Sequence, residues 1–250
     1  MRATTCTPRA MPGATRLLAV QLGMVLAWSS GFVGYRYAME QAPVFLTSFW
    51  RFAVCLALLL PFAWAGLRRL SARQWRRQAL IGALAYAGYI VPIAKAIELG
   101  VSPGVAALMA DLLPLLVALL ALALATLLQK RWDDAPGSLA VVLFVQIGAA
   151  LPAFAGLALA EGSLRPPLSG GFLFGLAWLV LLPTFGGYGL YWLGLRHLSA
   201  QGGSAALYLS PALTLLWAHW MFAEPLTPML LGGLLLSLAG LGWLYRAERR

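Results

Sequence analysis

The stretch VFLTSFWRFAVCLALLLPFAWAGL at residues 44–67, followed by RRLSARQWRR at residues 68–77, decides the fold of this chain. The first part can cross the hydrocarbon core of a bilayer, which needs about 20 predominantly apolar residues in a helix. Its only charge is Arg51. The second part holds five arginines, and a basic loop directly after a span is typical of the cytoplasmic side of a membrane. The stretch therefore predicts a transmembrane helix that ends in the cytoplasm.

The same alternation of apolar runs and charged loops continues along the chain. With 61% hydrophobic and 10% charged residues, the 250-residue chain lacks the polar surface of a soluble globular domain. The apolar runs predict eight membrane helices, at residues 17–37, 44–67, 79–99, 103–128, 139–160, 171–195, 203–222 and 227–245. The predicted fold class is all-α, a polytopic transmembrane helix bundle.

The basic residues set the orientation of these helices. If the N-terminus is cytoplasmic, the inner side holds 14 of the 18 lysines and arginines. They are Arg2, Arg9, Arg16, Arg68, Arg69, Arg73, Arg76, Arg77, Lys130, Arg131, Arg196, Arg246, Arg249 and Arg250. The positive-inside rule therefore predicts a multi-pass protein of the cell inner membrane with both termini cytoplasmic. This topology also accounts for the net charge of +10, so the expected partners are the lipid bilayer and a small solute, with no nucleic acid.

Three pairs of similar motifs predict an internal repeat. The pairs are SPGVAALMADLLP at 102–114 with SAQGGSAALYLSP at 199–211, LPFAWAG at 60–66 with LPAFAG at 151–156, and Gly88-Tyr89 with Gly187-Tyr188. Their offsets of 97, 91 and 99 residues indicate one duplication with small insertions. Because each pair lies three helices apart, the two copies cross the membrane in opposite directions, as in many secondary transporters. We expect halves at residues 1–128 and 129–250.

Four longer strings, in this order and spacing, resemble one transporter family. They are AWSSGFVGYRY at 27–37, FWRFA at 49–53, GVSPGVAALMADLLPLL at 100–116 and GLRHLSAQGGSAALYLSP at 194–211. They are similar to the EamA family of the drug/metabolite transporter (DMT) superfamily, whose members typically have ten helices in two inverted halves of five. The resemblance implies that this chain has lost about two transmembrane helices near residues 120–130. It also implies a cavity open to lipid on one side unless two copies associate as a homodimer.

Four ionisable residues inside the predicted spans are candidates for a polar pocket in the outer half of the membrane. A charge in the hydrocarbon region costs about 2.5–3.5 kcal/mol on insertion scales, so each needs a reason. Arg51 and Lys95 could extend to the outer interface along their flexible stems, or they could face a polar pocket. Asp111 is shorter, and we expect it to face water or Lys95. His219 could serve a proton or a substrate, or it could be an interfacial residue.

Other candidates for the substrate pathway are prolines and polar or aromatic residues. Pro114 and Pro211 occupy matched positions in two predicted helices, where each would leave a backbone carbonyl free to face a cavity. Four further residues could line that cavity or serve helix packing: Trp28, Ser29, Ser30 and Tyr208.

No catalytic constellation occurs in the sequence. It contains no HExxH, GxSxG or glycine-rich phosphate motif, so we expect no enzyme activity, cofactor or metal site. The predicted function is a secondary transporter, an exporter of small metabolites, amino acids or drugs. Two alternatives remain open: a decayed or partner-dependent membrane paralogue that does not transport, and an integral-membrane enzyme.

Overall fold

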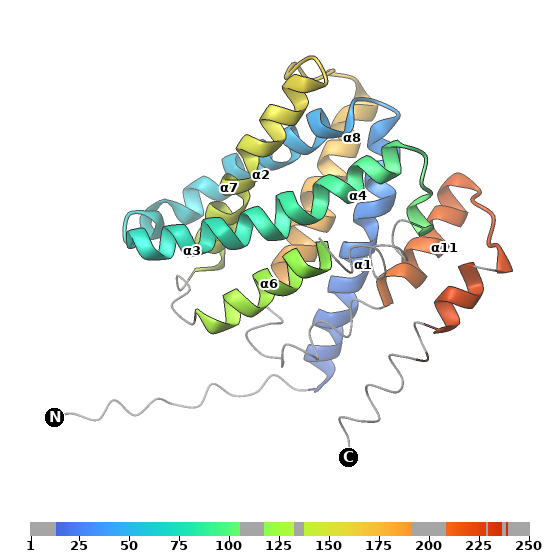
Figure 1. Cartoon of the computed structure of the whole chain (residues 1–250), viewed down its shortest axis with the longest axis horizontal. Coiled ribbons are helices and arrows are strands. Elements are labelled where there is room, and N and C mark those ends of the chain that lie inside the picture. The colour runs from blue at the N-terminus through green and yellow to red at the C-terminus, as the bar shows by residue number, and fades with distance from the viewer. Residues whose placement is uncertain are drawn as a thin grey trace.

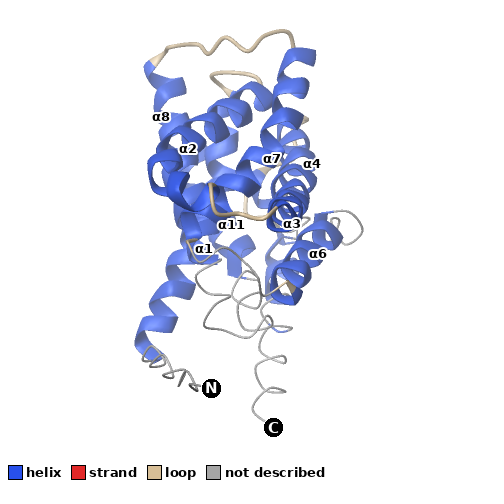
Figure 2. Cartoon of the chain, turned by 90° about the vertical axis from the view of Figure 1, so that its left-hand side faces the viewer, coloured by secondary structure: helices blue, strands red, loops and turns tan. Residues whose placement is uncertain are grey.

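A computed structural model describes residues 14–105, 118–132, 138–191, 209–228, 230–236 and 239 of the chain. Within these residues the regular elements are helices joined by loops (Figure 2). In chain order they are α1 Ala14–Met39, α2 Val44–Leu67, α3 Ala72–Gly82, η1 Ala83–Gly88, α4 Tyr89–Glu98, α6 Ala118–Arg131, α7 Leu139–Ala160, α8 Gly170–Leu179, η2 Val180–Tyr188 and α11 Ser210–Phe222. The segments η1 and η2 are π-helical and continue the α-helices before them.

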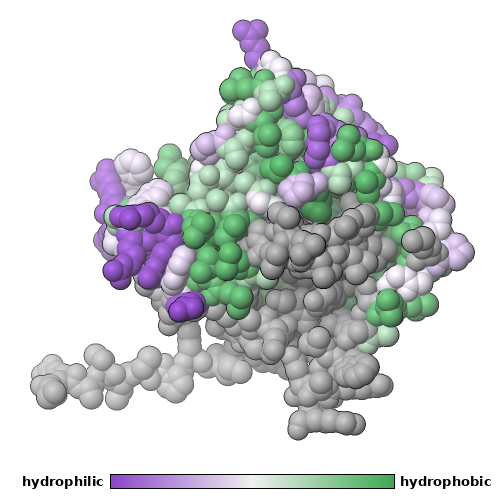
Figure 3. Space-filling view, in the orientation of Figure 1, coloured by the Kyte–Doolittle hydropathy of each residue, from purple (hydrophilic) through white to green (hydrophobic). Residues whose placement is uncertain are grey.

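Four of the described helical stretches are long and apolar enough to cross a membrane. They are Val44–Leu67, Ala72–Glu98, Leu139–Ala160 and Gly170–Tyr191. Large apolar side chains on their outer faces remain exposed, with Phe62 at 76%, and the surface between the polar ends is largely apolar (Figure 3). Such a surface suits lipid as the solvent. The chain is therefore a multi-pass membrane protein, and the prediction of an all-α bundle is confirmed.

The predicted and observed helix boundaries differ most after α2, at the start of α3. Both α2 and α7 have the predicted bounds, but the helix predicted at 79–99 begins at Ala72. Ser71 and Gln74 form a capping box there: the Ser71 hydroxyl accepts from Gln74 N, and the Gln74 side chain accepts from Ser71 N. This cap starts the helix inside the arginine-rich segment, which lacks the apolar run on which the prediction depended. Hydrophilic surface marks this region at the left of Figure 3.

The helices alternate in direction, so that their ends gather at two poles. We call the Glu161 end the one where α1, α4 and α7 finish and α2 and α8 begin (Figure 1). The Arg77 end lies opposite, where α3 begins and where the Arg77 guanidinium carbon lies 5.0 Å from the centroid of the Trp132 ring. Antiparallel α2 and α7 pack side by side. Such pairing is expected if the two are inverted copies of one element.

The two π-helical segments fall at the matched glycine-tyrosine motifs. The segment η1 ends at Gly88, and η2 ends at Tyr188. The two segments meet, because the rings of Tyr86 and Tyr188 stack with centroids 4.1 Å apart and the Tyr188 hydroxyl donates to Ala85 O at 3.0 Å. Single π turns inside α-helices are rare and are frequent at functional sites. The repeated motif thus has a repeated backbone irregularity.

Four predicted spans are described only in part, among them the span at 171–195, which is described as far as residue 191. Of the span at 103–128, residues 103–105 are helical and α6 covers the last part, and α11 covers the second half of 203–222. Residues 230–236 are helical within 227–245. The count of eight spans, the halves at 1–128 and 129–250, and the superposition of Pro114 on Pro211 stay predictions.

Candidate functional site

A cavity of about 40 Å³ lies in the bundle where α1, α2, α4 and η2 meet. Its lining is Trp28, Gly31, Phe32, Tyr35, Arg51, Tyr89, Ile90, Ile93, Pro183 and Tyr188. A single water molecule needs about 10–15 Å³ of such cavity volume, so this cavity is large enough for a group of a few heavy atoms. These described lining residues are apolar or aromatic around a single charge, which is typical of pockets for small molecules.

That charge is the guanidinium of Arg51, which is only 2% exposed. Its Nε donates to Thr184 Oγ1 at 2.7 Å, and its Nη1 donates to the Tyr35 hydroxyl at 3.1 Å. The guanidinium carbon also lies 5.1 Å from the centroid of the Phe52 ring, within the range of a cation–π contact. Arg51 therefore turns into the bundle and does not extend to the outer interface.

Aromatic rings form one wall of the cavity. The Trp28 ring lies 4.8 Å from Tyr188 and 6.0 Å from Tyr89, measured between centroids. Its Nε1 donates to the Tyr89 hydroxyl at 3.4 Å. Trp28 from α1 thus contacts Tyr188, the last residue of η2, and Tyr89, the first residue after η1, and all three residues line the cavity.

The serines next to Trp28 have packing roles in this conformation. Ser29 donates to Val25 O at 2.7 Å, and its Oγ lies 3.2 Å from Ser210 Oγ, which ties α1 to the start of α11. Ser30 donates to Ala27 O at 2.6 Å. Both side chains are buried, and neither belongs to the cavity lining.

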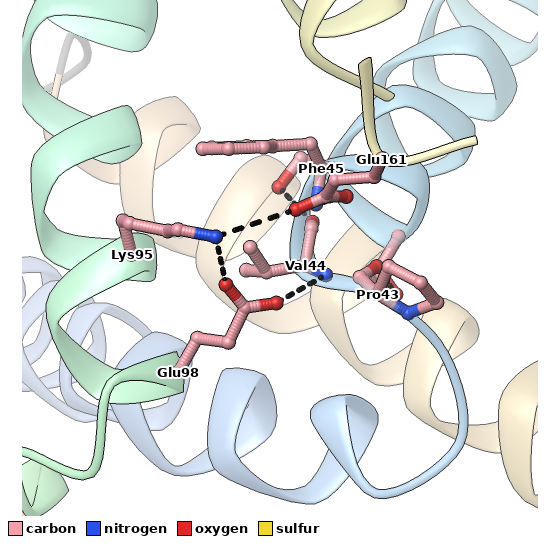
Figure 4. Close-up of polar contacts among 8 residues, drawn as sticks. Pro43, Val44, Phe45, Lys95, Glu98 and Glu161 are labelled. Carbon is pink, nitrogen blue, oxygen red and sulfur yellow. Dashed lines mark hydrogen bonds and ion pairs between the residues drawn. The ribbon is translucent and has the colours of Figure 1, made fainter. Parts of the chain in front are cut away.

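Lys95 lies at the Glu161 end, apart from the cavity lining, in an ionic cluster (Figure 4). Its ammonium group pairs with Glu98 and lies 3.8 Å from Glu161 Oε1. The two carboxylates accept from the first N–H groups of α2, Glu98 from Val44 N at 3.4 Å and Glu161 from Phe45 N at 3.0 Å. We call Lys95, Glu98 and Glu161 the end cluster. It supplies the helix cap that Pro43 cannot, and it ties α2, α4 and α7 together.

The end cluster should make stability depend on pH through Glu161. Burial raises the pKa of this carboxyl above its ordinary value of 4.5, while the N–H of Phe45 opposes the rise. The folded protein therefore binds this proton more tightly than the unfolded chain. The resulting stabilisation is full below pH 4.5 and is lost as the pH rises through the raised pKa.

We expect Glu161→Gln to reduce the gain in thermal stability between pH 7 and pH 5, because the neutral amide no longer titrates. Unfolding midpoints of the detergent-solubilised protein measure this gain. Glu40→Gln is the matched control, since Glu40 is an exposed carboxylate paired with Arg36 at 3.0 Å. An unchanged pH dependence in Glu161→Gln would contradict the assignment.

Two candidates from the C-terminal part differ from expectation. His219 is exposed in the last turn of α11, where its Nδ1 lies 2.8 Å from Glu224 O, so it closes the helix end and does not line the cavity. Pro211 was expected inside a helix, but it is the second residue of α11. Proline is common in the first turn of a helix, where the N–H that it lacks has no helical partner.

The last three sequence candidates lie outside the described residues, and the structure adds four residues that the sequence did not indicate. Asp111, Pro114 and Tyr208 lie outside the described residues. The sequence reasoning did not find Tyr35, Thr184, Tyr89 or Tyr188, which line the cavity or hold Arg51. Two features of the sequence could have pointed to these contacts. Thr184 places a hydroxyl inside an apolar run, and Lys95 and Glu98 are three residues apart, as in an ion pair on one helix face. Among the described residues, no group of three or more His, Cys, Asp or Glu could hold a metal ion.

Comparison with known protein families identifies one family that matches this chain. The EamA-like transporter family matches the chain twice, at residues 16–129 and at residues 123–246. None of the curated proteins and none of the solved structures matches the chain. The two matches together cover almost the whole chain, and the cavity is lined by residues from both.

Proposed function

Because the chain belongs to the EamA-like transporter family, we propose that it is a secondary transporter that exports small metabolites, amino acids or drugs across the cell inner membrane. Membership and the apolar helices make it a membrane transporter in general terms. Export and the inner membrane are parts of the proposal. Members of the family are transporters and not enzymes, which agrees with the absence of catalytic motifs in the sequence.

One observation carries the proposal: the cavity lies between the two family matches. Trp28, Arg51 and Tyr89 come from the match at 16–129, and Pro183 and Tyr188 come from the match at 123–246. In transporters built from inverted repeats, the solute site typically lies at the interface of the repeats, on helices with interrupted hydrogen bonding. The π-helical η2 supplies such an interruption at this cavity, and η1 ends directly before the lining residue Tyr89.

The end cluster would act as a closure on one side of this pathway. It ties α2, α4 and α7 together beyond the cavity, and the Lys95 side chain is 42% exposed, so water can replace its ionic contacts at modest cost. Separation of these helix ends would open the cavity toward that side. Asp111, Pro114 and Tyr208 remain proposed members of the pathway outside the described residues.

We expect both termini and the Arg77 end in the cytoplasm, because 14 of the 18 basic residues then lie inside. Reporter fusions after Arg77 and Arg131 should report the cytoplasm, and fusions near Glu40 and Arg165 should report the opposite side. A fusion after Arg77 that reports the outside would overturn the orientation, since that loop and helix start hold five arginines.

Efflux from cells tests the function. Overexpression in a metabolite-sensitive host should raise resistance to at least one member of a panel of amino acids, organic acids and drugs, relative to an empty vector. Membrane insertion is verified in parallel by the reporter fusions. If a well-inserted protein gives no resistance and no efflux across the panel, the chain is a non-transporting paralogue.

A further inference from the structure

We propose that the cavity binds the carboxylate of a monoanionic organic acid with a compact apolar body, and that Arg51 holds this carboxylate. This inference rests on the proposed transport function and names its substrate class. It is carried by the charge, the hydrogen bonding and the lining of the cavity, each of which narrows the chemistry of the ligand.

The charge of Arg51 has no acidic partner in the described part of the chain. No carboxylate there lies within 4.0 Å of its guanidinium. The four described acids are engaged elsewhere: Glu40 with Arg36, Glu98 and Glu161 with Lys95, and Glu224 with Ser102. A buried cation in a membrane protein is costly without an anion. A carboxylate in the adjoining cavity would supply that anion.

The guanidinium is held in place by two chains of hydrogen bonds. Nη1 donates to Tyr35, whose hydroxyl lies 2.9 Å from Ser48 Oγ, and Ser48 donates to Val44 O at 2.8 Å. Nε donates to Thr184, which donates to Leu179 O at 2.8 Å. Each hydroxyl both accepts and donates, so the two chains fix the guanidinium plane.

These contacts leave donors of Arg51 for a ligand. The guanidinium has five N–H donors, and the two contacts use one on Nε and one on Nη1. The planar fork of an arginine suits a carboxylate, which can accept two parallel hydrogen bonds. Because the guanidinium is already ordered, little side-chain entropy is lost when the ligand binds.

The lining limits the rest of the ligand. Among the described lining residues Arg51 is the only charged one, so a single negative charge is matched and a dianion is not. Phe32, Ile90, Ile93 and Pro183 offer no polar side-chain atoms to a polyhydroxylated solute. The volume of about 40 Å³ fits a carboxylate, and because the cavity is partly open, the apolar body of a compact ligand can extend beyond it.

Benzoate, benzamide and benzylamine test the inference, because they share one ring and carry charges of −1, 0 and +1. Binding to the purified full chain in detergent is measured by calorimetry and by the shift of the unfolding midpoint. We expect benzoate to bind on the order of tenfold to a hundredfold more tightly than benzamide, the range of a charged hydrogen bond. Equal or tighter binding of benzamide or benzylamine would overturn the proposal.

Two variants locate the binding, and one controls for charge. Arg51→Gln should remove the preference for benzoate, while Arg165→Gln removes an exposed positive charge and should keep it. Ile93→Trp narrows the cavity without touching the hydrogen bonds of Arg51, and it should weaken benzoate binding even if Arg51→Gln does not fold. Benzoate affinity that is unchanged in Ile93→Trp would place the binding elsewhere and refute the site.

Binding and transport can fail separately. Benzoate binding that depends on Arg51, without flux in any assay, would support the carboxylate site and contradict the transporter. Flux of neutral or cationic solutes without benzoate binding would support the transporter and contradict the carboxylate site.

Discussion

Arg51→Gln should lower the efflux of a transported organic acid at least about tenfold, because the variant loses the one charge among the described lining residues of the cavity. Glutamine also cannot reproduce the donors that reach both Thr184 and Tyr35. The rate of efflux from preloaded cells measures this loss. Arg165→Gln, with the same change of charge in an exposed loop, should retain the efflux of the unmodified chain.

The amount of folded protein separates a local effect from a collapse of the bundle. A monodisperse peak of Arg51→Gln in size-exclusion chromatography shows that the bundle forms, and loss of efflux is then assigned to the cavity. Efflux that persists at the full rate in a folded Arg51→Gln protein would contradict the role of Arg51.

Gly82→Ala should destabilise the bundle strongly, by about 3 kcal/mol, the upper end of the usual cost of overpacking. A Cβ atom at Gly82 would lie 2.2 Å from Gln146 O and 2.4 Å from Gln146 Cα. These are backbone atoms, so α3 and α7 would have to separate. Gln146 also donates from Nε2 to Gln78 at 2.8 Å and to Gln129 at 3.1 Å, and this separation would disturb both bonds.

Gly156→Ala is the matched control, because a Cβ atom at this position in α7 meets nothing within 4 Å. Alanine favours a helix over glycine by about 1 kcal/mol, so this variant should be as stable as the unmodified chain or more stable. Thermal unfolding in detergent compares the two variants. Equal midpoints for Gly82→Ala and Gly156→Ala would contradict the close crossing of α3 and α7.

The sequence predicted the helices best where apolar runs end at charge or at a loop. Both α2 and α7 have their predicted bounds, because polar segments flank long uninterrupted runs. The start of α3 was missed because Ser71 and Gln74 cap a helix whose first turns are polar. Hydropathy detects the part of a helix that lies in lipid and not the part that continues beyond it.

The site could be predicted only in outline. Arg51 could be identified because it is a charged residue inside a transmembrane span, and Trp28 was among the residues expected to line a cavity. The partner of Arg51 could not be found, because Thr184 is 133 residues away and is brought near only by the packing of α2 and η2. For the same reason the sequence could not show that Lys95 pairs with Glu161, which ends α7.

Flux through the purified protein is the most direct test of a transport pathway between the two halves. The full chain and Arg51→Gln are reconstituted in proteoliposomes, and the movement of a radiolabelled organic acid such as benzoate is followed against protein-free liposomes at a pH where the acid is ionised. We expect flux with the full chain and little above background with Arg51→Gln. Background flux with the folded full chain, for benzoate and for a panel of amino acids and drugs, would contradict the account.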